Sequence, residues 1–237
     1  LETKKQKENL TADEVVEETV KKESGTIKTR RVLVSAAPKE LVQKYAAMFS
    51  IAGIQLKALE TEAFALIRSL VGKDRSRVMV IDMGYDHTSV TIIQDGIPFL
   101  HRSIQVGGNT ITERIAASMS IDMEEAEQVK RDLSAGPKTS VPPVLMDAFK
   151  PILHEIRFTL ELYDQQDFHV YNTVDKIILT GGSAHLPYLD PFLSDALNLN
   201  IYLGNPWARI ITPAKLAPAL DDIGPRMSVA IGLAMKK

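Results

Sequence analysis

Residues 77–94 read RVMVIDMGYDHTSVTIIQ, and this stretch decides the fold of the chain. Its apolar run at 78–81 predicts a buried strand, because consecutive hydrophobic residues leave no polar face for solvent. The run ends at Asp82, a turn that contains a glycine follows, and a second β-branched run resumes at 89–94. The pattern therefore predicts a strand, an Asp-x-Gly turn and a returning strand.

Several polar groups gather at this turn. Gly84 lets the backbone approach a ligand closely, and Thr88 and Ser89 offer hydroxyl donors. Asp82 can hold a hydrated Mg²⁺ through water, because this ion keeps several of its waters in protein sites. Together these groups suit a phosphate and its magnesium, but ordinary β-hairpins use the same kind of turn. The stretch by itself leaves both interpretations open.

Composition limits the classes of function. The 237 residues can bury a sizeable core, and the length favours two lobes. With 28 basic and 30 acidic residues the net charge is −2, which disfavours a nucleic-acid protein that relies on a basic surface. The absence of cysteine excludes disulfides, Cys-ligated zinc and thiol chemistry, and the 5 histidines are dispersed.

The ends and the hydropathy of the chain suggest a cytoplasmic protein. No apolar run approaches the roughly 20 residues that a membrane span needs. The charged amino terminus does not resemble a signal peptide. The chain starts at Leu1 without an initiator methionine, which fits an internal fragment of a longer protein.

The first quarter of the chain predicts an α+β module. A capping-box pattern favours a helix over 12–22, and the apolar run at 30–36 favours a buried strand. Pro38 opens an amphipathic helix that Gly53 ends, and residues 54–59 are predicted to form a short strand. A second helix is expected over 61–70.

The middle of the chain predicts a third antiparallel strand and then helices. The strand is expected at 97–105, after an Asp-Gly turn. A helix over 123–133 places Glu127 and Lys130 three residues apart, so both can converge on one ligand, although most such pairs are solvated salt bridges. Pro151 lies inside a long apolar-periodic stretch, which predicts two helices or a kink.

The last third contains a second junction suited to a nucleotide. The buried strand predicted at 176–180 runs directly into Gly181, Gly182 and Ser183, and a helix follows. Such a junction allows close backbone approach and directs helix N–H groups at a ligand. It is neither the G-x-G-x-x-G fingerprint nor a Walker A loop. A helix of small residues is predicted at the end of the chain.

The order of these motifs is more specific than any one of them. An Asp-x-Gly turn, Gly-Gly-x-x-Ile-Thr, Ala-Glu-x-x-Lys, Leu-Thr-Gly-Gly and a small-residue closing helix resemble the actin/Hsp70/hexokinase ATPase superfamily. Within it, residues 32–65, 82–109 and 204–210 resemble the PilM family of type IV pilus assembly proteins, and FtsA more distantly. The resemblance implies an α/β, actin-like (ribonuclease H-like), two-lobed ATPase fold.

The resemblance also implies a site for ATP and Mg²⁺. The second phosphate loop of the family matches Asp82, Gly84, Thr88 and Ser89, with Asp82 holding Mg²⁺ through water. The ribose and base contacts match Glu127 and Lys130, and the adenosine motif matches Gly181, Gly182 and Ser183. Glu62 falls near the residue that positions the attacking water in hydrolysing relatives.

The family pattern gives a domain assignment with one departure. Residues 1–57 resemble subdomain 1C, 58–74 a remnant of 1A and a linker helix, 75–225 domain 2 with helical 2B at about 111–170, and 226–237 the closing helix. The first phosphate loop is missing, so the amino-terminal part of domain 1 is expected to be absent. Either upstream residues are missing, or the chain has half a phosphate clamp and at most slow ATP turnover.

Three functions stay open at this point. The first is a cytoplasmic, nucleotide-dependent assembly protein that binds the cytoplasmic amino-terminal tail of PilN near residues 32–54, and so reaches the inner membrane through its partner. The second is a scaffold with a vestigial cleft. The third, an FtsA-like cell-division protein, is disfavoured because no amphipathic membrane helix ends the chain. Pilus motor ATPases and further copies of the chain are additional candidate partners; nucleic acid and direct membrane insertion are not expected.

Overall fold

The computed structural model describes residues 13–20, 28–133, 141–165 and 173–236. It divides the chain into two compact units, residues 1–61 and 62–237.

The first unit contains a two-stranded antiparallel sheet. Strand β1 (Asp13–Val20) pairs with β2 (Lys28–Ser35), in a register that sets Asp13 opposite Ser35 and Val20 opposite Lys28. The strand predicted at 30–36 is confirmed, but its predicted burial is wrong, since Val34 and Ser35 are exposed. The helix predicted at 12–22 is also wrong. Asp13–Val20 is rich in β-branched residues, which favour strands, and pairing with β2 outweighs the local capping pattern.

Helix α1 (Lys39–Ile51) confirms the predicted amphipathic helix of this unit. It ends at Ile51, two residues before Gly53, which adopts φ +68°, and none of its residues is buried. The strand predicted at 54–59 is wrong, since this stretch has no regular secondary structure. A strand needs a partner for its backbone groups, and the described sheet of this unit consists of β1 and β2 alone.

The second unit is built on a mixed five-stranded sheet in the order β5-β4-β3-β6-β7. The strands are β3 (Val78–Met83), β4 (Thr88–Gln94), β5 (Ile97–Ile104), β6 (Lys176–Thr180) and β7 (Ile201–Leu203). β3, β4 and β5 are antiparallel neighbours, whereas β6 and β7 run parallel to β3. The predicted strand–turn–strand is confirmed, with Asp82 opposite both Ser89 and Thr180.

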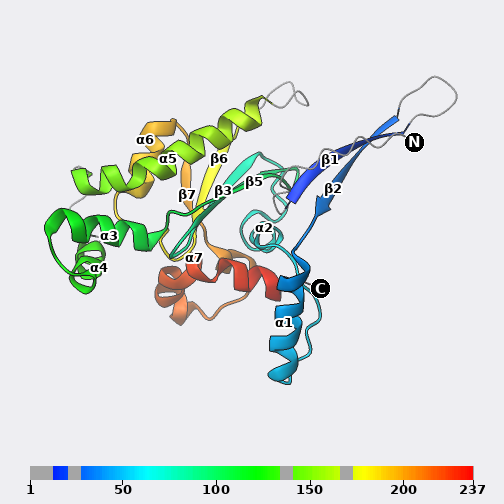
Figure 1. The fold of residues 1–237 in the computed structure, drawn as a ribbon, viewed down its shortest axis with the longest axis horizontal. Helices are drawn as coiled ribbons and strands as arrows, with labels where there is room; N and C mark the ends of the chain where they lie inside the picture. Colours follow the sequence, from blue (N-terminus) through cyan, green and yellow to red (C-terminus); the bar gives the residue numbers. More distant parts are fainter. Residues whose placement is uncertain (1–12, 21–27, 134–140, 166–172, 237) are drawn as a thin grey trace. The chain divides into compact units, whose positions relative to one another are not determined.

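Helices cover both faces of this sheet (Figure 1). One face carries α3 (Gly108–Met119), α5 (Pro143–Asp164) and α6 (Leu189–Leu197), while α4 (Met123–Asp132) packs on α3. The other face carries α2 (Glu62–Leu66), its continuation as the π-helix η1 (Ile67–Val71), and α7 (Ala217–Ala234).

The alternation of β3 explains the two cores. Met79, Ile81 and Met83 pack with α3, α5 and α6, while Val78 and Val80 pack with α2 and η1. Because the strand is apolar on both faces, it must lie in the middle of a covered sheet. This arrangement places the carboxyl ends of β3 and β6 side by side, at one edge of the sheet.

Two helices are longer than the sequence predicts. α5 runs through Pro151 as one helix, so the predicted division into two helices is wrong; Phe149 and Ile152, both fully buried, hold it against the sheet. α7 begins at Ala217, well before the helix predicted at 226, although Pro225 lies inside it. Proline removes a helical hydrogen bond, and packing against the sheet and its neighbours compensates for that loss.

A short 3₁₀ segment, η3 (Pro206–Arg209), joins three elements of this unit. Just before it, the Gly204 N–H donates to the Leu179 carbonyl of β6 at 2.7 Å. The Trp207 indole donates to the Leu220 carbonyl of α7 at 2.6 Å. The Arg209 guanidinium donates to the last three carbonyls of η1 at 2.9, 2.9 and 2.6 Å.

Candidate functional site

A cavity of about 850 Å³ opens at the carboxyl edge of the sheet in the second unit. Its walls come from the β3–β4 turn, α3, α4, the β6–α6 junction and α7. Five residues singled out in the sequence line it, namely Glu127, Lys130, Gly181, Gly182 and Ser183. Ligand sites in α/β proteins commonly lie at this edge, and the volume suits a small organic ligand.

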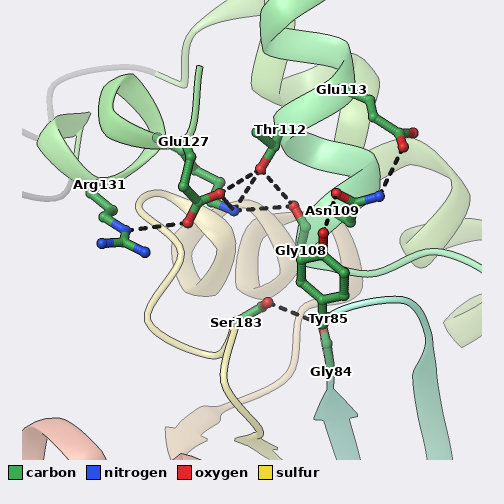
Figure 2. A network of polar contacts seen from close by, with 10 residues as sticks. Gly84, Tyr85, Gly108, Asn109, Thr112, Glu113, Glu127, Arg131 and Ser183 are labelled. Carbon is green, nitrogen blue, oxygen red and sulfur yellow. Dashed lines mark hydrogen bonds and ion pairs between the residues drawn. The ribbon is translucent and has the colours of Figure 1, made fainter. Parts of the chain in front are cut away.

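The wall from α3 and α4 carries a polar network (Figure 2). Lys130 Nζ lies 2.5 Å from Glu127 Oε2, 2.7 Å from Thr112 Oγ1 and 3.1 Å from the Gly108 carbonyl. Thr112 Oγ1 lies 2.7 Å from the same Glu127 oxygen. The other oxygen, Oε1, accepts from Arg131 at 3.2 Å. The pair predicted from i,i+3 spacing is therefore part of a network that spans two helices.

The network keeps Glu127 ionised. Burial raises the pKa of its carboxyl, but the hydrogen bonds from Lys130 and Thr112 outweigh burial, and the pKa lies below its ordinary value. An ionised carboxylate is a strong acceptor for hydroxyl donors of a ligand.

The glycine junction fits closely against the end of β3. Gly181 has φ +91°, and an added Cβ would lie 2.3 Å from Asp82 Oδ1 and 2.4 Å from the Met83 carbonyl oxygen. Ser183 donates from its N–H to Met83 at 2.9 Å and from its hydroxyl to the Gly84 carbonyl at 3.1 Å. Gly182 is exposed, and an added Cβ would make an ordinary van der Waals contact with Arg226 Nε at 3.6 Å.

The predicted phosphate loop lies beside the cavity lining. The Gly84 N–H donates to the His87 carbonyl at 2.9 Å, and the Gly84 carbonyl accepts from the Gly108 N–H at 3.0 Å. Thr88 is fully buried and its hydroxyl donates to the Val106 carbonyl at 2.7 Å; Ser89 is also buried. The structure therefore gathers Glu127, Lys130 and residues 181–183 in the cavity and places Asp82, Gly84, Thr88 and Ser89 next to it.

Asp82, the residue predicted to hold magnesium, lies at the end of β3 and is largely buried. Burial raises its pKa to about 6, the nearby charge of Glu62 adds to the shift, and His87 opposes it. Glu62 itself lies exposed in the first turn of α2. The described residues contain no group of three or more His, Asp or Glu side chains that could hold a metal directly. One carboxylate with ligand phosphates and waters is an arrangement that Mg²⁺ accepts, so the residues fit a water-mediated ion.

The raised pKa of Asp82 predicts a pH-dependent cost to stability. The pKa of about 6 in the folded chain exceeds the value of 3.8 in the unfolded chain. The contribution of the Asp82 carboxyl to the free energy of unfolding is therefore fully present below pH 3.8, where the group is protonated, and is lost as pH rises through 6 and the group ionises. Without added metal, Asp82→Asn is expected to be more stable than the wild type by about 2 kcal/mol at pH 7.5, with little difference at pH 4. Urea unfolding at both pH values measures this.

The matched control is Asp86→Asn, which changes an exposed carboxylate of the same turn. It is expected to alter the free energy of unfolding by less than about 0.5 kcal/mol. An Asp82→Asn difference that stays constant from pH 4 to 7.5 would contradict the predicted linkage.

Sequence reasoning missed several residues of the site. Thr112 is buried between α3 and α4, and Tyr85 donates to Asn109 Oδ1 at 2.8 Å at the cavity rim. Arg226 of α7 also lines the cavity. One available signal is that Thr112 follows Ile111 on the apolar face of its helix, where a polar residue needs a buried partner.

Comparison with known proteins identifies the family. The family model described as type IV pilus assembly protein PilM matches residues 11–237. The chain belongs to the PilM family. The resemblance predicted from the order of the motifs is thereby confirmed, and the chain is a PilM-family type IV pilus assembly protein.

Solved structures confirm the actin-like fold of this PilM-family chain. It is similar to a PilM–PilN type IV pilus biogenesis complex, with 26% identity, a TM-score of 0.72, and coverage of 94% of this chain and 66% of that chain. MreB5 of Spiroplasma citri bound to AMPPNP shows 18% identity and a TM-score of 0.65, over 85% of this chain and 65% of that chain.

Curated relatives of the PilM-family chain are more distant. FtsA of Bacillus subtilis is 24% identical over 176 residues, which is 65% of this chain and 40% of FtsA. FtsA of Enterococcus faecalis is 23% identical over 222 residues, 81% of this chain and 50% of FtsA. The chain thus spans half or less of these two relatives. In the part of the chain that the structure describes, no helix is long and apolar enough to cross a membrane.

Proposed function

We propose that this PilM-family chain binds ATP with Mg²⁺ in the cavity and uses the nucleotide to set the conformation that it presents to a PilN-like partner. The observation that carries the proposal is the cavity itself. The cavity lies at the carboxyl edge of the sheet. Its lining includes the ionised carboxylate of Glu127 on α4 and the exposed Gly182 at the β6–α6 junction. The AMPPNP-bound MreB5 structure, which shares the fold, supports a nucleotide as the ligand.

The adenosine half of the proposed site lies in the cavity. Glu127 and Lys130 form its charged wall, where the ribose binds, and Gly181, Gly182 and Ser183 form the wall that the nucleoside approaches closely. Glycine at 182 leaves room for a ligand because no side chain projects there.

The phosphate half lies at the end of β3. Gly84, Thr88 and Ser89 shape the turn, Asp82 holds a hydrated Mg²⁺, and Glu62, whose charge reaches Asp82, orients water. Bound Mg²⁺ would neutralise phosphate charge, which is a main requirement of phosphoryl transfer.

We base the proposed partner and location of the chain on its membership of the PilM family. The PilM–PilN complex among the similar structures supports a PilN-like protein as partner. We propose that the chain binds the cytoplasmic amino-terminal tail of that partner, which would place the chain in the cytoplasm beside the inner membrane. We assign residues 1–57 to subdomain 1C, 58–74 to 1A and the linker, 75–225 to domain 2 and 226–237 to the closing helix. Pilus motor ATPases and further copies of the chain are secondary partners in this proposal.

A scaffold that binds nucleotide without turning it over is the second candidate. The phosphate turn favours it, because the Gly84 N–H and the Thr88 hydroxyl already donate within the fold. Those two donors cannot serve a phosphate without rearrangement. Turnover is therefore tested separately from binding, by release of inorganic phosphate.

Calorimetric titration of Mg-ATP into the chain tests the proposal. The wild type is expected to bind, and Gly182→Asp is expected to bind at least about tenfold more weakly, because the new side chain occupies the adenosine half of the cavity. Asn200→Asp, which adds the same charge at an exposed position before β7, at the end of the sheet opposite the cavity, serves as the control and should bind as the wild type does.

Two results would contradict parts of the proposal. Absence of binding heat at millimolar Mg-ATP would rule out nucleotide binding by this chain. Equal affinities of the wild type and Gly182→Asp would place the nucleotide elsewhere. Binding without phosphate release would favour the scaffold.

A further inference from the structure

The ammonium group of Lys130 has no hydrogen left for a ligand. An ammonium carries three donors, and three acceptors surround this one, namely Glu127 Oε2, Thr112 Oγ1 and the Gly108 carbonyl. The Lys130 side chain is only 11% exposed. Lys130 can therefore affect ligand binding only by positioning the groups to which it donates.

The Thr112 hydroxyl bridges the two helices that form this wall. It accepts from Lys130 and donates to Glu127, both at 2.7 Å, and the residue is 2% exposed. The single hydroxyl hydrogen has two acceptors in reach, Glu127 Oε2 at 2.7 Å and the Gly108 carbonyl at 3.1 Å. The shorter bond to the ionised carboxylate is the stronger one, so the network favours one rotamer of Glu127. Figure 2 shows Thr112 between Glu127 and the first turn of α3.

The two oxygens of Glu127 differ in what they can still accept. Oε2 takes two hydrogen bonds from buried donors, whereas Oε1 takes one bond from Arg131, whose side chain is 70% exposed. An exposed ion pair of this kind is weak and can yield to a ligand. Oε1 is therefore the oxygen with the greater remaining capacity to accept a hydrogen bond from a ligand.

We propose that Thr112 is the positioning residue of this site: together with Lys130 it locks Glu127 so that Oε1 accepts hydrogen bonds from the ribose hydroxyls of a bound nucleotide. The inference rests on the proposed function, and it reassigns Lys130 from ligand contact to positioning. Pre-ordering the carboxylate removes the cost of ordering it when the ligand binds.

The network also joins the two halves of the site. The Gly108 carbonyl accepts from Lys130, while the Gly108 N–H donates to the Gly84 carbonyl at 3.0 Å. The first turn of α3 thus holds both the ribose wall and the phosphate turn. A change at Thr112 acts on a group that is fixed to both.

Calorimetry with Mg-ATP and Mg-2′-deoxyATP tests this role in three variants. The wild type is expected to prefer ATP by about tenfold, the effect of one charge-assisted hydrogen bond. Thr112→Val, which keeps the shape and removes the hydroxyl, should bind ATP about tenfold more weakly and reduce the preference to about twofold. Thr112→Ser should restore both. Ser118→Ala, at an exposed position of α3, is the control and should match the wild type.

The outcomes separate the two proposals. If the wild type binds neither nucleotide, the proposed function fails and this assignment fails with it. If the wild type binds and Thr112→Val retains both its affinity and its preference for ribose, this inference alone is overturned. A Thr112→Val protein that loses affinity equally for both nucleotides, with a lowered unfolding midpoint, would also overturn it, because a purely structural role produces that result.

Discussion

Gly232→Ala is expected to destabilise the chain by about 3 kcal/mol, the upper part of the usual range for overpacking. An added Cβ would lie 1.9 Å from the Ala65 carbonyl oxygen and 2.5 Å from its carbon. These are backbone atoms of α2, so no side-chain rotation relieves the clash and α2 must move away from α7. The Arg68 Nε bond to the Gly232 carbonyl, 2.8 Å long, is strained by the same movement. Urea unfolding measures the effect.

Helix propensity alone would predict the opposite result, namely that Gly232→Ala stabilises the chain. Alanine inside a helix is normally about 1 kcal/mol more favourable than glycine. Ala230→Gly, at an exposed position of the same helix, is therefore expected to lose about 1 kcal/mol through propensity alone. A Gly232→Ala protein as stable as the wild type would show that α2 and α7 do not pack this closely.

Gly181→Ala is expected to cost at least about 3 kcal/mol, from two causes. The residue adopts φ +91°, which costs an alanine about 1–2 kcal/mol, and its Cβ would lie 2.3 Å from Asp82 Oδ1 and 2.4 Å from the Met83 carbonyl oxygen. The substitution therefore separates the β6–α6 junction from the end of β3. Denaturant unfolding without ligand measures the loss.

Gly96→Ala separates the two causes. It has a similar φ of +78°, but its Cβ would meet only the end of the flexible Arg75 side chain, at 3.2 Å. It is expected to lose about 1–2 kcal/mol, the conformational part alone. If both alanine variants lose the same amount, the contact between Gly181 and β3 contributes nothing.

Local patterns predicted the centre of the fold well. The apolar run at 78–81 is buried on both faces, so its place in the sheet follows from its own residues. Gly181 directly follows a buried strand. Glycine is common at such a position because it lets the backbone lie close to a neighbouring strand, here the end of β3. In both places the burial or the tight turn is encoded within a few neighbouring residues.

Partners that are distant in the chain could not be predicted in this way. Asp13–Val20 has both a capping pattern and β-branched residues, and only its pairing with β2 decides between helix and strand. Thr112 and Lys130 are 18 residues apart and meet because α3 packs on α4. The spacing of Glu127 and Lys130 suggested that both contact the ligand. In the structure Thr112 bonds to both, and on our proposal this leaves Glu127 as the one that contacts the ligand.

The segment around η3 has a consequence for how the second unit opens. The chain contains no cysteine, yet Gly204, Trp207 and Arg209 together cross-link β6, α7 and η1, and the bond from Arg209 to Ser69 closes a loop of 140 residues. Elements tied in this way cannot exchange their amide hydrogens independently, since opening one breaks the bonds of the others. Helix α7, strand β6 and the π-helix η1 therefore form one cooperative unit of unfolding.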